Sequence, residues 1–269
     1  MQYDPIKKSL GNLFNKTPFL RILFYKLLDI LLLRTWHVNK EVRAWGKTHQ
    51  GKQQILDAGS GFGQYSFFLS GKNKNWSVEA VDVKEEQISD CTAFFHRIGR
   101  QNVRFGIADL TKYNRAETFD LILSVDVMEH IEDDEQVFRN FFNSMSPQGI
   151  LLISTPSDQG GSDVHDHGEE SSFIDEHVRD GYNINEIQDK LKKAGFTNTT
   201  ARYVYGKPGQ IGWRLSMKYP IQLLNISKLF FILLPFYYLI TFPFALIFNR
   251  MDLVGKHKTG TGLIVKAFK

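Results

Sequence analysis

A strand, a glycine-rich turn and a helix are indicated in succession by residues 55–69. The stretch begins with apolar residues, turns through Gly59, Gly61 and Gly63, and continues with apolar residues at helical spacing. Glycine is needed where the backbone takes a positive φ or approaches a ligand closely. A unit of this kind opens nucleotide-binding α/β domains, so it constrains the chain to an α/β fold.

The turn departs from the dinucleotide-binding fingerprint. Gln64 stands three residues after Gly61, where that fingerprint has a third glycine. An acid, Asp57, precedes the first glycine by two positions and ends the expected strand. A carboxylate here suits a cationic ligand better than a pyrophosphate.

Apolar strands alternate with helical segments from residue 54 onward. The strand candidates are residues 54–58, 77–82, 103–107, 119–124 and 149–154. Helices are expected at 85–98, which Gly99 closes, and at 134–145. Repeated βαβ units imply a mostly parallel sheet with right-handed crossovers, and ligands then bind at the carboxyl ends of its strands.

Length and composition allow one large domain with an appendage. The chain has 269 residues, of which 42% are hydrophobic, so it can bury a full core. Its single cysteine, Cys91, excludes an internal disulfide and a cysteine-based zinc site, which suits a reducing cytoplasm. The net charge of +4 is compatible with an anionic membrane surface or nucleic acid and establishes neither.

The first 50 residues form an N-terminal extension. Residues 18–33 are rich in Leu, Ile and Phe with basic residues interspersed, which predicts one long amphipathic helix. Charges interrupt the apolar run and no small-residue cleavage site follows, so no signal peptide is expected. The helix either packs over the domain's own sheet or lies at a membrane interface with its basic residues at the lipid headgroups.

A long polar segment at 156–182 interrupts the alternation. It contains His165, His167 and His177 among several acids, and long loops after strands are usual places for function. The first two histidines and their neighbouring carboxylates are donor types that bind metals. Since such loops are more often simply solvated, no metal site is predicted.

An uncharged apolar stretch of membrane-spanning length runs over residues 229–248. It contains Pro235 and Pro243, which bend or break a helix. A last strand is expected at 261–268. The chain thus divides into an extension at 1–50, a core at 51–206, an apolar insertion at 207–260 and a final strand at 261–269.

Five segments in this order resemble the motifs of the class I S-adenosylmethionine-dependent methyltransferases, above all the broad subgroup that includes the quinone-biosynthesis methyltransferases. The segments are residues 56–63, 81–83, 108–110, 119–131 and 146–154. The resemblance covers residues 40–206 and 261–268. It implies a Rossmann-like, seven-stranded, mostly parallel sheet with helices on both faces, to which this chain adds the N-terminal amphipathic helix and an apolar helical insertion before the last strand.

The resemblance also implies S-adenosylmethionine as cofactor. The turn at 59–63 would let the backbone approach the amino-acid head, with Asp57 nearby, and Asp82 would accept hydrogen bonds from both ribose hydroxyls. Asp109 would receive the adenine amino group, although either of these last two acids could merely cap the following segment. The implied cofactor residues are Asp57, Gly59, Ser60, Gly61, Gly63, Asp82, Val83, Asp109, Leu110, Ser124 and Val125. Among them, Leu110 would lie against the adenine ring, and Ser124 and Val125 would line the methionine end.

The methyl acceptor is less constrained. Methyl transfer to oxygen or nitrogen usually needs a proton removed, and histidine is the side chain suited to this near pH 7. We predict His130 or His167 as the base, with packing as the alternative for His130, and an oxygen acceptor. His177 lies in a segment similar to one that closes over the substrate in this subgroup. The absence of an Asn-Pro-Pro-Tyr motif disfavours amino-methylation of nucleobases.

The insertion separates two strands of one sheet, so it must return to the side from which it left. We predict a bent, shallow membrane insertion, broken at Pro235 or Pro243. The alternative is a helical cap buried against the domain or a second subunit. The favoured function is therefore methylation of a lipophilic small molecule, such as a quinone precursor, a polyene or another lipid, by a monotopic enzyme on the cytoplasmic face of the cell membrane.

Two other functions stay open on the sequence alone. One is a soluble, dimeric small-molecule methyltransferase, and the other is a non-catalytic binding protein with the same fold. Nucleic acid is not an expected partner, because the chain has no dedicated RNA-binding appendage and no aromatic-basic platform.

Overall fold

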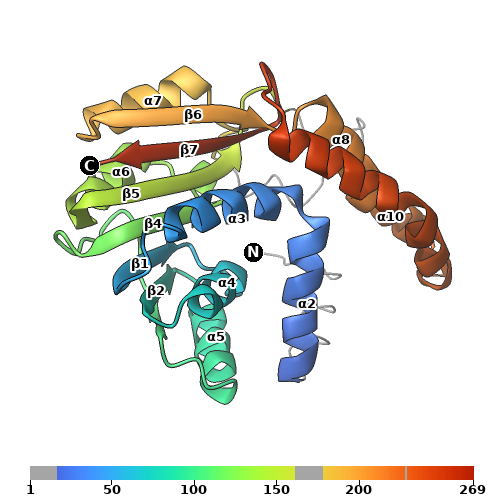
Figure 1. The fold of residues 1–269 in the computed structure, drawn as a ribbon, viewed down its shortest axis with the longest axis horizontal. Coiled ribbons are helices and arrows are strands. Elements are labelled where there is room, and N and C mark those ends of the chain that lie inside the picture. The colour runs from blue at the N-terminus through green and yellow to red at the C-terminus, as the bar shows by residue number, and fades with distance from the viewer. Residues whose placement is uncertain (1–16, 161–177, 228) are drawn as a thin grey trace.

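A seven-stranded sheet forms the centre of the protein in the computed structural model, which describes residues 17–160, 178–227 and 229–269. The strand order is β3-β2-β1-β4-β5-β7-β6, and β7 alone runs antiparallel to its neighbours (Figure 1). The strands are β1 (Gln53–Ala58), β2 (Trp76–Asp82), β3 (Val103–Ile107), β4 (Phe119–Val125), β5 (Met145–Pro156), β6 (Asn198–Val204) and β7 (Gly262–Phe268). The expected mostly parallel sheet is confirmed, and its four leading strands lie within one residue of their predicted bounds.

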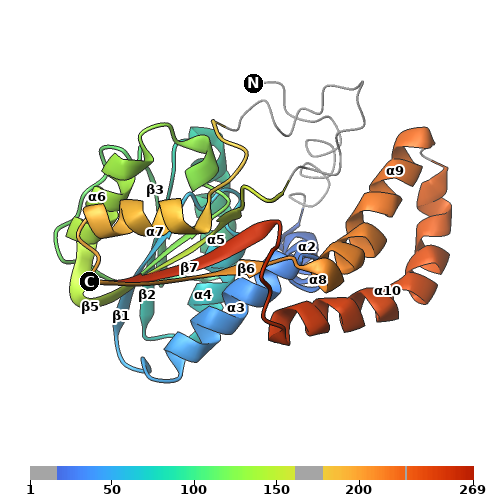
Figure 2. The same ribbon diagram turned by 90° about the horizontal axis from the view of Figure 1, so that it is seen from above.

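Helices cover both faces of this sheet and extend beyond one end of it (Figures 1 and 2). Those before β4 are α2 (Pro18–Leu31), α3 (Leu33–Gly46), α4 (Gln64–Lys72) and α5 (Glu85–Arg97). Those after it are η1 (Met128–His130), α6 (Asp134–Ser144), α7 (Ile184–Lys193), α8 (Lys207–Trp213), the π-helical turn η2 (Arg214–Lys218), α9 (Tyr219–Ile226) and α10 (Phe230–Val254).

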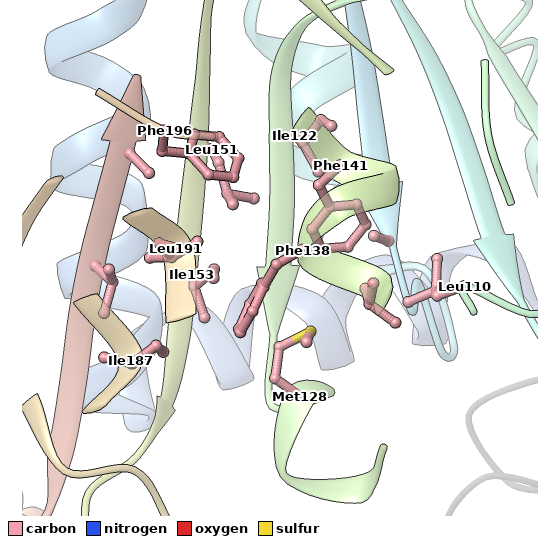
Figure 3. Close-up of a cluster of buried hydrophobic side chains, with 14 of the residues drawn as sticks. Leu110, Ile122, Met128, Phe138, Phe141, Leu151, Ile153, Ile187, Leu191 and Phe196 are labelled. Carbon is pink, nitrogen blue, oxygen red and sulfur yellow. The ribbon is translucent and has the colours of Figure 1, made fainter. Parts of the chain in front are cut away.

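The core consists of two layers, one on each face of the sheet. On one face, Phe138 and Phe141 of α6 and Leu191 of α7 pack against Leu151 and Ile153 of β5 (Figure 3). Apolar side chains of α2, α3, α4 and α5 fill the other face. Because side chains alternate along a strand and both faces are covered, the inner strands read as continuous apolar runs.

The helix predicted over residues 18–33 is present as α2, which ends at Leu31, two residues before the predicted end. Leu32 takes an extended conformation, with φ −90° and ψ 112°, and separates α2 from α3. This break lets Val38 and Val42 of α3 pack in the core while Tyr25 of α2 reaches the glycine turn. No proline or glycine marks the position, and the second helix, α3, was not predicted from the sequence.

The insertion between β6 and β7 is a helical hairpin. Its first arm continues through α8, η2 and α9, and α10 returns as the second arm to the start of β7 (Figure 2). The predicted break at Pro235 or Pro243 is wrong, because α10 runs through both prolines. It bends part-way along instead, as a proline-containing helix commonly does (Figure 2).

Two tyrosines of the second arm satisfy carbonyl groups of the first. Pro220 has no N–H group, so it cannot donate to the carbonyls one helical or π-helical turn before it. The Tyr237 hydroxyl donates to the Leu215 carbonyl at 2.7 Å, and the Tyr238 hydroxyl donates to the Ser216 carbonyl at 2.8 Å. These bonds fix the two arms together through the groups that the proline leaves free.

Asp252 anchors the hairpin to the core. Its side chain is fully buried, and it accepts hydrogen bonds from His37 Nε2 at 2.8 Å, the Tyr205 N–H at 3.1 Å and the Gly209 N–H at 3.2 Å. His257 Nε2 lies 3.1 Å from its other carboxylate oxygen. Although burial opposes it, the contact with His37 and the charge of His257 hold the pKa of Asp252 below its usual value. One carboxylate thus joins α3, both ends of the hairpin and the loop after it.

Replacing Asp252 by alanine is expected to lower the free energy of unfolding by about 3 kcal/mol, because it leaves buried donors without their charged acceptor. The depressed pKa of Asp252 means that its contribution is present above pH 3.8 and is lost as the pH falls through the folded-state pKa, so parent and variant should converge in acid. Urea denaturation at a series of pH values measures both effects.

Asp189→Ala is the matched control, because that carboxylate is exposed and forms only an i,i+3 pair with Lys192. It should change the unfolding free energy by less than about 0.5 kcal/mol. Equal effects of the two substitutions would contradict an anchoring role for Asp252.

Candidate functional site

The glycine turn between β1 and α4 has the backbone conformation that its glycines predict. Gly59, Gly61 and Gly63 have φ values of +80°, +52° and +84°, a region that side-chain-bearing residues rarely adopt. A Cβ on Gly59 would lie 2.3 Å from a methyl of Val127, whereas one on Gly61 would approach nothing closer than 3.9 Å. Val127 therefore packs closely against the turn at Gly59, whereas the space beside Gly61 is open.

Asp82 fastens this turn to the end of β2. Its Oδ2 accepts a hydrogen bond from the Gly61 N–H at 2.9 Å, and its Oδ1 accepts one from the Lys84 N–H at 3.0 Å. The side chain is only half-buried. Since a carboxylate has about four acceptor positions, two remain for hydroxyl donors. The capping and the ribose-binding interpretations of Asp82 are thus compatible.

Asp57 lies beneath the turn rather than on its open side. It is 2% exposed and accepts a hydrogen bond from the Ser66 hydroxyl of α4 at 2.5 Å. Burial raises its pKa to about 6, and the bond from Ser66 opposes the shift. In this position it supports the start of α4, and it approaches a cofactor only through the turn above it.

The third motif lies as a turn after β3. Asp109 accepts from the Thr111 N–H at 2.9 Å and from its hydroxyl at 2.7 Å, contacts that hold the pKa of Asp109 below its usual value. Leu110 is buried in the core layer around α6 (Figure 3). The capping interpretation therefore describes the contacts that Asp109 makes here, and its role toward adenine stays a prediction.

Two exposed apolar side chains stand beside Asp82. Val83 follows it in the chain and is 62% exposed, and Ile107 pairs with it across the β2–β3 register and is 58% exposed. Apolar groups at this edge suit the flat face of an adenine. Ile107 was missed in the sequence, although an apolar residue ending an edge strand is a signal that could have found it.

Three buried serine hydroxyls have no hydrogen-bond partner within the described part of the chain, and two of them lie at this turn. These two belong to Ser60 in the turn and Ser124 near the end of β4, and Ser124 pairs in register with Ala58 of β1. Buried polar groups are nearly always paired, so two orphans around one glycine turn point to a polar ligand. The arrangement fits a small molecule that carries an amino-acid head. Val125, the other residue expected at this end, completes β4 and is half-buried.

Helix α2 holds the turn from outside. Arg21 Nη2 and the Tyr25 hydroxyl both donate to the Phe62 carbonyl, at 2.8 and 2.5 Å. The same guanidinium pairs with Asp90 of α5 at 2.5 Å. The N-terminal extension is thus part of the site, a role that no motif in the sequence indicates.

A charged cluster lies just beyond β4. Asp126 has a positive φ of +51° and forms an ion pair with Arg34 of α3. Glu129 is 1% exposed and accepts from the Thr155 hydroxyl of β5 at 3.1 Å. Burial, and then the negative charge of Asp126, raise the pKa of Glu129. Tyr205 closes the cluster, because its hydroxyl accepts from the Arg34 N–H at 2.8 Å.

Of the two histidines predicted as the base, the structure describes His130 but not His167. His130 lies in η1, directly after Glu129, and its side chain is exposed. His165, His167 and His177 lie outside the described residues. Within the described ranges, no three His, Cys, Asp or Glu side chains gather as they would around a metal ion. Glu129 is the titratable group that sequence reasoning missed, and its signal was an acid that follows an apolar strand.

Comparison with known proteins identifies the family. A family model for a methyltransferase domain matches residues 49–202, which is more than half of the chain. The chain belongs to this methyltransferase family. Solved neighbours of the same fold include complexes with S-adenosylmethionine and with S-adenosylhomocysteine. The class I methyltransferase fold and S-adenosylmethionine as cofactor are thereby confirmed, and the orphaned serine hydroxyls and open glycine turn fit that cofactor.

Curated relatives share only this domain with the chain. Phosphoethanolamine N-methyltransferase of Triticum aestivum is 34% identical over 151 residues, which are 55% of this chain and 29% of that protein. Malonyl-[acyl-carrier protein] O-methyltransferase of Bacillus anthracis is 31% identical over 112 residues, or 42% of this chain and 40% of that protein. The chain therefore spans less than half the length of either.

Solved structures agree on the fold. Phosphoethanolamine N-methyltransferase 2 of Haemonchus contortus superimposes with a TM-score of 0.59 at 17% identity, over 86% of this chain and 52% of that one. A putative sarcosine dimethylglycine methyltransferase of Galdieria sulphuraria gives 0.58 at 19% identity, over 88% and 85%. Similarity at this level establishes the shared architecture and leaves the substrate to other arguments.

Replacing Asp82 by alanine is expected to weaken S-adenosylmethionine binding about 100-fold, since two hydrogen bonds to a charged acceptor contribute on the order of 1.5 kcal/mol each. Isothermal titration calorimetry measures the affinity, and thermal melting shows whether the turn still folds. Asp189→Ala serves as the control. Unchanged affinity in a folded Asp82→Ala protein would refute the assigned role.

Proposed function

We propose that this methyltransferase transfers the methyl group of S-adenosylmethionine to an amphiphilic small molecule held at the cytoplasmic face of a membrane. The supporting observation is the surface of α10. That helix is long and apolar enough to cross a membrane, yet only 6% of its most apolar window is buried within the described structure. Its outward side chains are between 56% and 76% exposed, and they are Ile232, Phe236, Leu239, Ile240, Phe244 and Ile247.

The hairpin lies on the ligand side of the sheet. The parallel strands point toward α2, α8 and α10, so the carboxyl ends that carry the cofactor residues face the same end of the molecule (Figure 1). A second apolar stripe lies on the outer side of α2, where Phe19, Leu23, Leu27 and Ile30 are between 39% and 72% exposed. Contiguous exposed apolar surface of this kind is typical of membrane or protein contact.

The sheet determines how the hairpin can meet a bilayer. β6 and β7 pair over their full lengths, from Asn198 opposite Phe268 to Val204 opposite Gly262. Both ends of the hairpin therefore belong to one rigid sheet on one side of the membrane. This supports a monotopic contact, with the hairpin entering and leaving by the same leaflet.

For the acceptor atom we propose an amine nitrogen. Phosphoethanolamine and coclaurine N-methyltransferases are among the named relatives, whereas one relative is an O-methyltransferase. The oxygen acceptor and the quinone or polyene substrates expected from the sequence stay predictions that these names do not support. An amine head group on an apolar tail would satisfy both the relatives' chemistry and the exposed hairpin.

In the proposed methyl transfer, different residues of the chain bind the cofactor, position it and accept a proton. Bound S-adenosylmethionine supplies an electrophilic methyl group. The glycine turn and Asp82 hold it, and Arg21 and Tyr25 keep the turn in place. Positioning of this kind supplies much of the catalysis in an in-line displacement. Glu129 is the candidate that accepts the acceptor's proton, because its raised pKa matches a proton exchange near neutral pH.

Replacing Glu129 by glutamine is expected to lower kcat about 100-fold, the usual contribution of general base catalysis. Its pKa is raised to about 8, so the folded state binds the proton more tightly and the parent's stability should decline as the pH rises from about 5 to 8. The variant should lack that decline. Methyl transfer and thermal melting over this pH range give the two readouts, and a pH-independent loss of stability alone would indicate a structural role.

Lipid-phase activity tests the proposed function. Purified full-length protein is given labelled S-adenosylmethionine with either a lipid extract or its water-soluble fraction, and label is expected in the lipid fraction. Serine substitutions of Ile232, Phe236 and Leu239 should reduce that labelling at least 10-fold while leaving cofactor affinity unchanged, because these side chains are exposed.

Label confined to the water-soluble fraction, with the hairpin variant as active as the parent, would refute the proposal. Light scattering that shows a detergent-free dimer with a covered hairpin would support the soluble alternative instead.

A further inference from the structure

The hairpin segment carries a net positive charge, because it contains almost no acids. Residues 207–260 contain seven lysines and arginines and one acid, whereas the whole chain carries a net charge of +4. The remaining residues therefore carry a net charge of −2. The single acid is Asp252, which is fully buried and engaged by His37. The accessible charge of the hairpin segment is thus entirely positive.

Part of this charge surrounds a hollow at the base of the hairpin. The hollow lies where α8 begins and α10 ends, and its lining includes Lys207, Met251, Lys256, His257, Lys258 and Thr259. The three lysines are exposed, and none forms an ion pair with another residue that the structure describes. His257 is turned inward to Asp252, so the lysines supply the charge that a ligand would meet.

Apolar surface begins at the edge of this hollow. Met251 is 49% exposed and Val254 is 61% exposed, and the exposed apolar side chains of α10 continue from there through Leu239 to Phe231. The twelve residues from Met251 to Leu239 alone rise ~18 Å, so this apolar surface is more than long enough to span the ~15 Å hydrocarbon layer of one leaflet. A cationic hollow followed by an apolar helix matches the order of groups along a phospholipid.

We infer that the hollow at the base of the hairpin binds the phosphate of an anionic phospholipid, and that the acyl chains of this lipid lie along α10. The inference rests on the membrane contact in the proposed function and adds the headgroup that the contact selects. Charge complementarity favours this occupant, because lysine ammonium groups at a bilayer surface are attracted to anionic lipids. A nucleic acid is disfavoured, because residues 229–248 of the hairpin carry no charge that could pair with its phosphates.

Vesicle flotation of the full-length protein tests the inference. Vesicles of phosphatidylcholine alone are compared with vesicles in which about one third of the lipid is phosphatidylglycerol, and the parent is expected to bind the anionic ones at least 10-fold more tightly. The triple variant Lys207→Glu, Lys256→Glu, Lys258→Glu should lose that preference. Its affinity for neutral vesicles should stay that of the parent, because the apolar face of α10 is intact.

A matched triple variant, Lys47→Glu, Lys72→Glu, Lys74→Glu, makes the same change of net charge. These lysines are exposed and lie near the amino ends of the strands, away from the hairpin. It should keep the preference for anionic vesicles. Equal loss in both triple variants would overturn the inference, because it would show a response to net charge rather than to a site.

The remaining outcomes separate this inference from the proposed function. If the parent binds neutral and anionic vesicles equally, the phosphate site is refuted and the membrane contact stands. If the parent binds neither, both are refuted, while retained S-adenosylmethionine binding would still establish a cofactor-binding methyltransferase fold. Thermal melting of each triple variant confirms that a loss of binding does not come from unfolding.

Discussion

The pairing of β7 between β5 and β6 is the constraint on which the rest of the molecule depends. β7 completes the sheet, and it can be reached only after the chain has left β6 and returned to the same edge. The segment between these strands must therefore begin and end at the same edge of the sheet. This segment consists of two helical arms. Asp252 joins the ends of both arms that lie next to the sheet to α3. An apolar segment that elsewhere would be a membrane span is thereby held as a hairpin beside the site.

The site itself is assembled from elements far apart in sequence. The glycine turn, the end of β2 and the end of β4 are the expected surroundings of the cofactor in a fold of this type. The N-terminal helices contribute to the same site. Arg21 holds the turn, and Arg34 pairs with Asp126, whose backbone has the positive φ often found at functional sites. Through Tyr205 the same arginine is one contact from the hairpin's anchor, so site and hairpin share a connected polar network.

The sheet and the glycine turn could be predicted from the sequence because their signals are local. Runs of apolar residues, closed by glycines and acids at fixed spacing, determine strands, turns and their order. Helix α3 and the continuity of α10 through Pro235 could not be predicted in this way, because each depends on what the segment packs against. The same holds for Glu129, whose proton affinity comes from burial beside Asp126 rather than from its neighbours in the chain. For Asp109, the local capping bond to Thr111 was foreseen as an alternative.

The tyrosine hydrogen bonds between the two hairpin arms determine whether the backbone carbonyls of the hairpin stay paired outside water. A carbonyl without a donor costs several kcal/mol in hydrocarbon, and Pro220 withholds one N–H from the turn that contains the Leu215 and Ser216 carbonyls. Because Tyr237 and Tyr238 of the opposite arm complete them, the pair of arms can leave water without exposing bare carbonyls at that point, whereas the first arm alone cannot. Partitioning is thus a property of the assembled pair. If the hairpin enters lipid as proposed, it does so already folded, so the free energy of its transfer is not reduced by a cost of folding there.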